Sequence, residues 1–182
     1  MKKTAFFSAA AAMTGLLAVA PFAHATDGTI EFTGMVTALT CTINGGNGGE
    51  NFSVALPPVS TSSLAAVGSS AGRTPFAITL TDCTPDNGQV ATYFEPGMTV
   101  DMTTNQLNVD LGGATNVQLR LLNNDYSKIL AGSPVATQNS LPTSINSGSA
   151  TLNYFVEYAQ NGASGATPGA ANSRIQYTLI YP

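Results

Sequence analysis

Side chains that most often carry catalysis or bind metals are scarce in this chain. Its 182 residues include one histidine, His24, and two cysteines. His24 lies in an N-terminal stretch that we expect to be removed, which leaves no imidazole for general acid–base catalysis, a serine–histidine pair or a zinc site. Only one lysine, Lys128, lies beyond that stretch, so the serines and threonines lack an activating base. The sequence therefore predicts no enzyme, no metal and no cofactor.

Carboxylates are the remaining chemical candidates. Asp101, Asp110 and Asp125 could suggest calcium, but their spacing fits no EF-hand loop, and we interpret them as solvated surface groups. Beyond the removable stretch the chain has ten acidic and four basic residues. Because nucleic-acid binding needs clustered Lys and Arg, this balance argues against a nucleic-acid partner.

The first 25 residues have the features of a secretory signal. Lys2 and Lys3 form a basic start, an apolar stretch follows over residues 5–22, and Ala23-His24-Ala25 is an A-x-A cleavage site. We expect cleavage after Ala25, with a membrane anchor as the alternative. Export would place both cysteines in an oxidising compartment, where an even count predicts one disulfide, Cys41–Cys83. The loop-entropy model assigns that closure about 4 kcal/mol.

The elements that would position these residues are mainly strands, because the sequence has many strand signals and few helix signals. Apolar and polar residues alternate in segments of four to eight residues, the pattern of half-buried strands, and Gly-, Asn- and Pro-rich turns separate them. Clear alternation occurs at residues 30–36, 76–80, 117–121, 152–158 and 175–181, with shorter candidates near 51–56, 89–94, 98–102 and 105–111. Residues 62–67 could form one helical turn. We predict one all-β domain, an antiparallel Greek-key sandwich.

The two ends of this domain complement each other. Residues 28–36 form an extended segment with Ile30, Phe32 and Val36 on one face and Gly34 between them. At the other end, the strand that contains Tyr181 has no following segment to cover its edge, and an uncovered apolar edge is a liability. Donation of the first segment to a neighbouring copy would satisfy both ends and propagate into a fibre. From alternation alone, a fold completed by the chain's own first segment is equally compatible.

Several stretches resemble the pilins of the chaperone–usher pathway, most closely the major subunits of type 1 fimbriae. Residues 28–36, GTIEFTGMV, match the G-T-V-x-F-x-G-x-V form of the family's donor strand, shortly before Cys41. Residues 56–64, 76–83, 114–117, 154–155 and 166–172 continue the match in order. The C-terminal motif is the most specific part: a glycine, alternating apolar residues and a penultimate tyrosine. Its residues here are Gly169, Ile175, Tyr177, Leu179, Tyr181 and Pro182.

The resemblance implies an incomplete immunoglobulin-like sandwich that lacks its last strand. Residues 1–25 would be the signal, 26–40 the donor-strand extension and 41–182 the pilin domain. A periplasmic chaperone would fill the groove and bind the carboxylate of Pro182, until the next subunit's extension replaced it at an outer-membrane usher. The donor residues would be Ile30, Phe32, Gly34 and Val36. The implied partners are other copies, the chaperone, the usher and a tip adhesin, and the implied location is a cell-surface fimbrium.

Two alternatives to a main shaft subunit stay open. One is a minor pilin at the tip or base, which would share the fold. The other is a self-contained secreted module that binds glycans, for which Tyr154, Tyr158, Tyr177 and Tyr181 could supply a platform. Their alternation favours packing on strand faces instead.

Overall fold

The computed structural model describes residues 30–34, 36, 38, 40–44 and 49–182. The predicted signal and its cleavage site lie outside these residues. By its internal contacts the chain divides into two units, Met1–Met35 and Val36–Pro182, and we describe each by itself. No strand is assigned to the described residues between 30 and 38, although their alternation predicted one.

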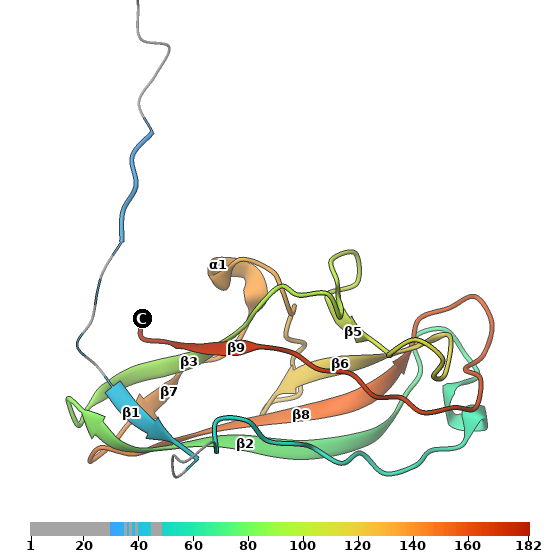
Figure 1. Cartoon of the computed structure of the whole chain (residues 1–182), viewed down its shortest axis with the longest axis horizontal. Coiled ribbons are helices and arrows are strands. Elements are labelled where there is room, and N and C mark those ends of the chain that lie inside the picture. The colour runs from blue at the N-terminus through green and yellow to red at the C-terminus, as the bar shows by residue number, and fades with distance from the viewer. Residues whose placement is uncertain (1–29, 35, 37, 39, 45–48) are drawn as a thin grey trace, which may run out of the picture. The chain divides into compact units, whose positions relative to one another are not determined.

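The second unit is an antiparallel sandwich of two sheets (Figure 1). The larger sheet has the strand order β1-β2-β8-β6-β5-β4 and the smaller one β7-β3-β9, and every recorded strand pair is antiparallel. The strands are β1 (Thr40–Ile43), β2 (Ser70–Thr84), β3 (Gly88–Phe94), β4 (Val100–Asp101), β5 (Gln106–Asn108), β6 (Val117–Asn123), β7 (Thr143–Ile145), β8 (Ala150–Gln160) and β9 (Tyr177–Ile180).

The helices are single turns. A 3-10 turn, η1 (Thr61–Leu64), lies near the helical turn predicted at 62–67, and Ser60 caps its N-terminus. The other, α1 (Val135–Gln138), had no sequence signal that we recognised. Among the described residues, no helix has the length and apolar character needed to cross a membrane.

The predicted all-β class is confirmed, with strands found in four of the five clearly alternating segments. Of the shorter candidates, residues 51–56 form no strand.

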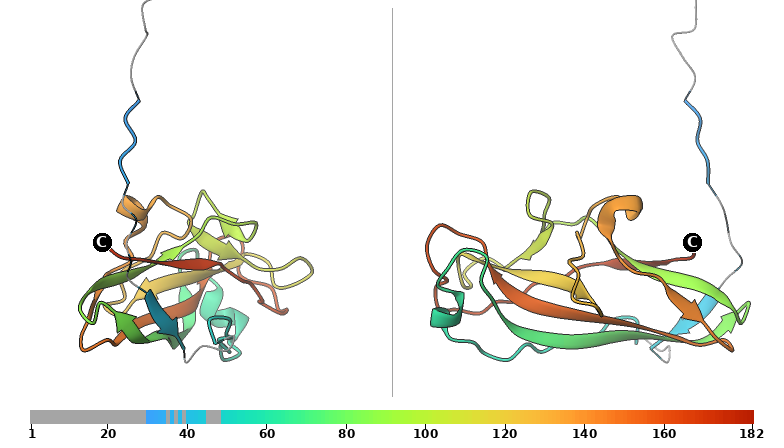
Figure 2. Two further views of the ribbon diagram at one scale, coloured as in Figure 1. Left: turned by 60° about the vertical axis from the view of Figure 1, so that its left-hand side comes forward. Right: turned by 180° about the vertical axis from the view of Figure 1, so that it is seen from behind.

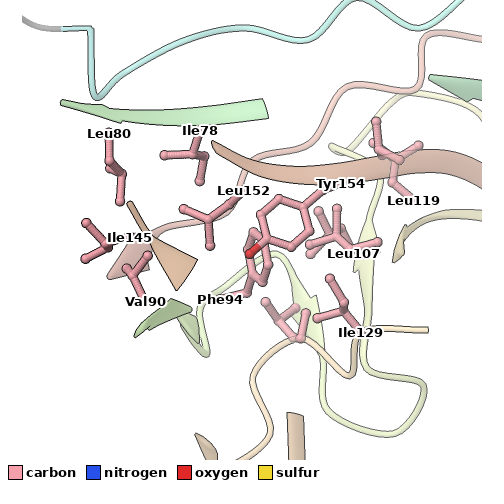
Figure 3. Packing of buried hydrophobic residues seen from close by; sticks show 14 of the residues in the cluster. Ile78, Leu80, Val90, Phe94, Leu107, Leu119, Ile129, Ile145, Leu152 and Tyr154 are labelled. Atoms are coloured by element: carbon pink, nitrogen blue, oxygen red, sulfur yellow. The ribbon is translucent and has the colours of Figure 1, made fainter. Parts of the chain in front are cut away.

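The core lies between the two sheets, as Figure 3 shows. Its centre is Tyr154 of β8, whose ring packs edge-on against Phe94 with the centroids 5.4 Å apart. The Tyr154 hydroxyl is buried but donates to Thr92 Oγ1 at 3.0 Å, so its polar end is satisfied. Leucine, isoleucine and valine side chains surround it, each worth roughly 1.5–3 kcal/mol on full burial. The alternation at residues 76–80, 117–121 and 152–158 supplies most of them.

Strand β8 runs between β2 and β6 in the large sheet (Figure 2). Its Glu157 is a buried carboxylate on the face of the sheet opposite to the core. Arg120 lies opposite it on β6 and donates to Glu157 Oε1, and Arg73 of β2 donates to Oε2 at 2.9 Å. Arg73 reaches it because β2 is irregular between Ala71 and Thr74, where Gly72 has a φ of 67°. Two residues there oppose one on β8, the arrangement of a β-bulge. Burial by itself would raise the pKa of Glu157, but the two guanidinium groups lower it overall.

The predicted disulfide is present. Cys41 of β1 and Cys83 of β2 are bonded, with their Cα atoms 4.1 Å apart. Strand β1 is only four residues long and lies at the edge of its sheet. The disulfide adds a covalent cross-link between it and β2 to their strand pairing.

Candidate assembly groove

A long groove of about 1090 Å³ opens between the two sheets. One rim consists of β9 and residues 171–176, and the other consists of β1 and residues 50–56. The floor is apolar and is drawn from both sheets: Phe76, Ile78, Phe94, Leu107, Leu119, Leu121, Val156 and Tyr158. Several of these are core residues, so the groove is a place where the core reaches solvent.

The first rim exists because β9 has a strand partner on one side only. It is the end strand of the order β7-β3-β9, and its pairs with β3 run from Ala91 opposite Ile180 to Phe94 opposite Tyr177. The other edge of β9 faces the groove. Ile175, Tyr177, Leu179 and Tyr181 pack against the core but remain half-buried. The structure thus brings these four predicted residues together along one rim.

The second rim, residues 50–56, was not recognised as part of a site from the sequence. It carries no regular secondary structure, yet Val54 and Leu56 pack against the core. Phe52 lies between Phe76 and Tyr177, with ring centroids 6.3 and 6.4 Å away. The apolar alternation at 52, 54 and 56 was the available signal, because a segment with one core-facing side keeps period two even without a ladder.

One hydrogen bond joins the two rims. The Tyr177 hydroxyl donates to the backbone oxygen of Glu50 at 2.9 Å. Burial, and secondarily the negative charge of Glu50, raise the pKa of Tyr177 above its usual value, so the hydroxyl stays protonated at neutral pH.

Three apolar residues of the predicted donor segment have exposed side chains. Ile30 is 78% exposed, Phe32 89% and Val36 100%. A Cβ built on Gly34 would meet no atom within 4 Å.

Two other residues of the C-terminal motif lie outside the groove lining. A Cβ on Gly169 would lie 2.7 Å from the backbone nitrogen of Ala114, so this glycine allows two loops to approach each other. Pro182 lines a separate cavity of about 150 Å³, together with Ala91 and Ile180.

Known proteins resemble this chain over most of its length. The model of the family "FimA: Type-1 fimbrial protein, A" matches residues 56–182. The major fimbrial subunit SMF-1 of Stenotrophomonas maltophilia is 51% identical over 91% of this chain and 99% of that protein. The F17 fimbrial protein of Escherichia coli is 40% identical over 92% of this chain and 95% of that protein.

Among solved structures, the P pilus rod subunit PapA superimposes with a TM-score of 0.60 at 19% identity, covering 78% of this chain and 99% of PapA. At that identity the likeness concerns the fold. The two sheets with one open groove are the incomplete immunoglobulin-like sandwich expected of such subunits.

Proposed function

The chain belongs to the type-1 fimbrial protein family and is a structural pilus subunit, and from this premise we propose that it polymerises head to tail by donor-strand exchange. Residues 26–36 of one copy enter the groove of the next and pair with the free edge of β9. The observation that carries the proposal is the groove itself: an apolar cleft between two rims, one of which is a strand with an unpaired edge.

The energetics favour a strand as the occupant. Ile30, Phe32 and Val36 have exposed side chains, and burying three such side chains contributes on the order of 5–8 kcal/mol. The backbone of an added strand also pairs with the groups along β9. A contact between one end of a copy and the groove of the next is heterologous and does not close, so it builds a fibre.

The groove also implies temporary partners before assembly. An exposed core and an unpaired strand edge promote aggregation, so a subunit exported alone needs a cover. We propose that a periplasmic chaperone lends a strand to this groove, that an outer-membrane usher catalyses the exchange, and that a tip adhesin ends the fibre on the cell surface.

The test is a gel of material sheared from cells. Donor-strand polymers are held by a high barrier to dissociation, so unheated samples should show a ladder of multimers that collapses to monomer on boiling. Phe32→Asp should abolish the ladder because it places a charge in the groove. Thr33→Asp is the matched control, since the neighbouring side chain points to the opposite face of an extended strand. A monomer band alone in the unheated wild-type sample would contradict the proposal.

A further inference from the structure

The face of the large sheet opposite to the core gathers most of the chain's positive charge. Beyond residue 25 the sequence has four basic residues. Two of them, Arg73 and Arg120, reach Glu157 on this face. A third, Lys128, is exposed and forms a bridge with Leu122, which lies two residues beyond Arg120 on β6 and so shares its face. An otherwise acidic protein therefore has one locally basic surface.

The carboxylates on this surface do not cancel its charge. Glu157 is buried and is shared by two guanidinium groups, so that cluster keeps one positive charge. Asp125 accepts hydrogen bonds from the backbone nitrogen and the hydroxyl of Ser127, at 2.9 and 2.6 Å, and is engaged within its own turn. With Lys128 included, the surface has a net charge of about +1, and it attracts anions at short range.

The guanidinium group of Arg73 is fixed at one edge and open at the other. Its Nε donates to Glu157 Oε2 at 2.9 Å, and its Cζ lies 4.5 Å from the centroid of the Tyr126 ring. In the described part of the chain, no group accepts a hydrogen bond from Nη1 or Nη2 of Arg73, and its side chain is 42% exposed. Two adjacent N–H donors on a fixed plane match the two oxygens of a carboxylate.

An aromatic strip lies beside these donors. The Tyr126 ring packs against the ring of Phe155, with the centroids 5.0 Å apart. Phe155 is half-buried on β8, and the exposed Pro75 lies opposite it on β2. Tyr126 itself is 54% exposed. The flat C–H face of a pyranose ring packs on apolar surfaces of this kind.

Both halves of the arrangement are positioned by unusual backbone. Tyr126 has a φ of 67°, which is uncommon for a residue with a side chain, and its nitrogen donates to the backbone oxygen of Asn123 at 3.0 Å. Gly72, which also has a φ of 67°, forms the irregularity in β2 that precedes Arg73. Such conformations persist where the surrounding structure enforces them, and they cluster at functional sites.

We propose that Arg73, Tyr126 and Phe155 form a binding site for an acidic sugar. Nη1 and Nη2 of Arg73 receive the carboxylate, and the two aromatic rings receive the apolar face of the sugar ring. The ligand class is a carbohydrate chain that carries uronic acids. The site is separate from assembly, since none of the three residues lines the groove. Each subunit of a fimbrium would offer one copy along its length.

The extent of the apolar surface favours a sugar over a second protein. On β2, β6, β8 and the turn at 123–127, Tyr126 is the one large hydrophobic residue that is strongly exposed. One ring and its neighbour cover an area similar to that of one or two sugar rings. A stable contact between proteins buries about 800 Å² on each partner around a larger apolar centre.

The first test measures the binding of trigalacturonate to sheared wild-type fimbriae by saturation-transfer NMR. The matched ligand is its methyl ester, which keeps the sugar rings and removes the charges. We expect the acid to bind at least tenfold more tightly than the ester, because charge-assisted hydrogen bonds are lost on esterification. Equal binding of acid and ester, or no binding of the acid, would overturn the proposal.

Variants then separate a fixed pair of donors from diffuse charge. Arg73→Lys keeps the charge but loses the planar pair of donors, and should weaken trigalacturonate binding about tenfold. Lys128→Gln is the matched control, since it removes a charge from the same face and should weaken binding less than about threefold. An equal or larger loss for Lys128→Gln would mean that charge alone attracts the ligand, and would overturn the site.

Tyr126→Asn tests the aromatic half and leaves both ion pairs of Glu157 intact. Asparagine tolerates the left-handed backbone at this position, so the turn should persist without the ring. Binding should weaken about three- to tenfold, and it decides the matter if Arg73→Lys fails to assemble. Unchanged binding would overturn the role of the ring.

The remaining occupant is a neighbouring copy of the chain. Fimbriae that bind no trigalacturonate, but that dissociate at a lower temperature when they carry Arg73→Lys, would assign this face to a contact between copies and overturn the sugar site. All these assays need fimbriae but no particular mode of assembly, so their failure leaves donor-strand exchange untouched.

Discussion

Strands β8 and β9 have the same alternation of apolar and polar residues but opposite surroundings. β8 lies between β2 and β6, and its residues pair on both sides. β9 pairs with β3 alone. Tyr154 of β8 is buried, whereas Tyr177 of β9 is half-buried and lines the groove.

The difference shows that the number of neighbouring strands, rather than the sequence pattern, decides how deeply a strand is buried. On β8 even a charge is buried, because Arg73 and Arg120 reach Glu157 from both adjacent strands. On β9, one edge and one row of half-buried side chains are available to another chain. The region around β8 stabilises the subunit, and in the proposed assembly the region around β9 connects it to its neighbours.

The largest expected effect concerns the disulfide that joins β1, at the rim of the groove, to β2. Replacing both Cys41 and Cys83 with serine should destabilise the subunit by about 4 kcal/mol, since the bond closes a loop with a sequence separation of 42. The denaturation temperature of sheared fimbriae, measured at one scan rate, would show the loss. An unchanged value would mean that β1 is held by its strand pairing alone.

The comparison is sharpened by two leucines, one from each region. Leu152→Ala on β8 leaves a cavity in the closed core and should cost about 2–5 kcal/mol. Leu179→Ala on β9 removes a half-buried side chain and should reduce unfolding stability less, while weakening the polymer ladder more. The two readouts are thermal unfolding and the temperature at which the ladder dissociates. If the same variant showed the larger loss in both assays, the distinction between the two regions would be wrong.

Glu157 gives the closed region an expected pH dependence. Its pKa is lowered by the two arginines, so its stabilising contribution is fully present above the unfolded value of about 4.3 and is lost as the pH falls through the folded value. Glu157→Gln should cost roughly 1–3 kcal/mol at pH 7, from the unpaired guanidinium groups. Thermal unfolding between pH 7 and pH 3 should then be less pH-dependent in the variant. An identical slope would assign the acid sensitivity to other carboxylates.

The smallest expected effect is in the groove. Tyr177→Phe removes the hydrogen bond to Glu50 but keeps the ring, so the subunit should lose about 0.5–1.5 kcal/mol. The unfolding temperature would measure this. Thr178 of β9, whose hydroxyl forms a solvent-exposed hydrogen bond with the half-buried Glu95, provides the control: Thr178→Val should have less effect. A larger loss for Thr178→Val would mean that the hydrogen bond between Thr178 and Glu95 stabilises the subunit more than the one between Tyr177 and Glu50.

Sequence reasoning identified the strands by a local property. At residues 76–80 and 152–158, alternation arises because each strand has one core-facing side, and that requirement leaves its mark on each strand separately. The same reasoning found the edge residues Ile175, Tyr177, Leu179 and Tyr181. It did not find the second rim, because residues 50–56 contact the core without a strand ladder. Nor did it find α1, whose four residues carry no periodicity.

By itself the sequence determined the all-β class, the single disulfide, the absence of histidine beyond residue 24 and the resemblance to pilins. These depend on residue identity and on spacing along the chain. Only the tertiary structure decided that Arg73 and Arg120 meet at Glu157, that residues 50–56 face β9, and that Tyr177 spans the groove between them. Those contacts join residues up to 127 positions apart, and a local pattern does not record which distant partner a side chain meets.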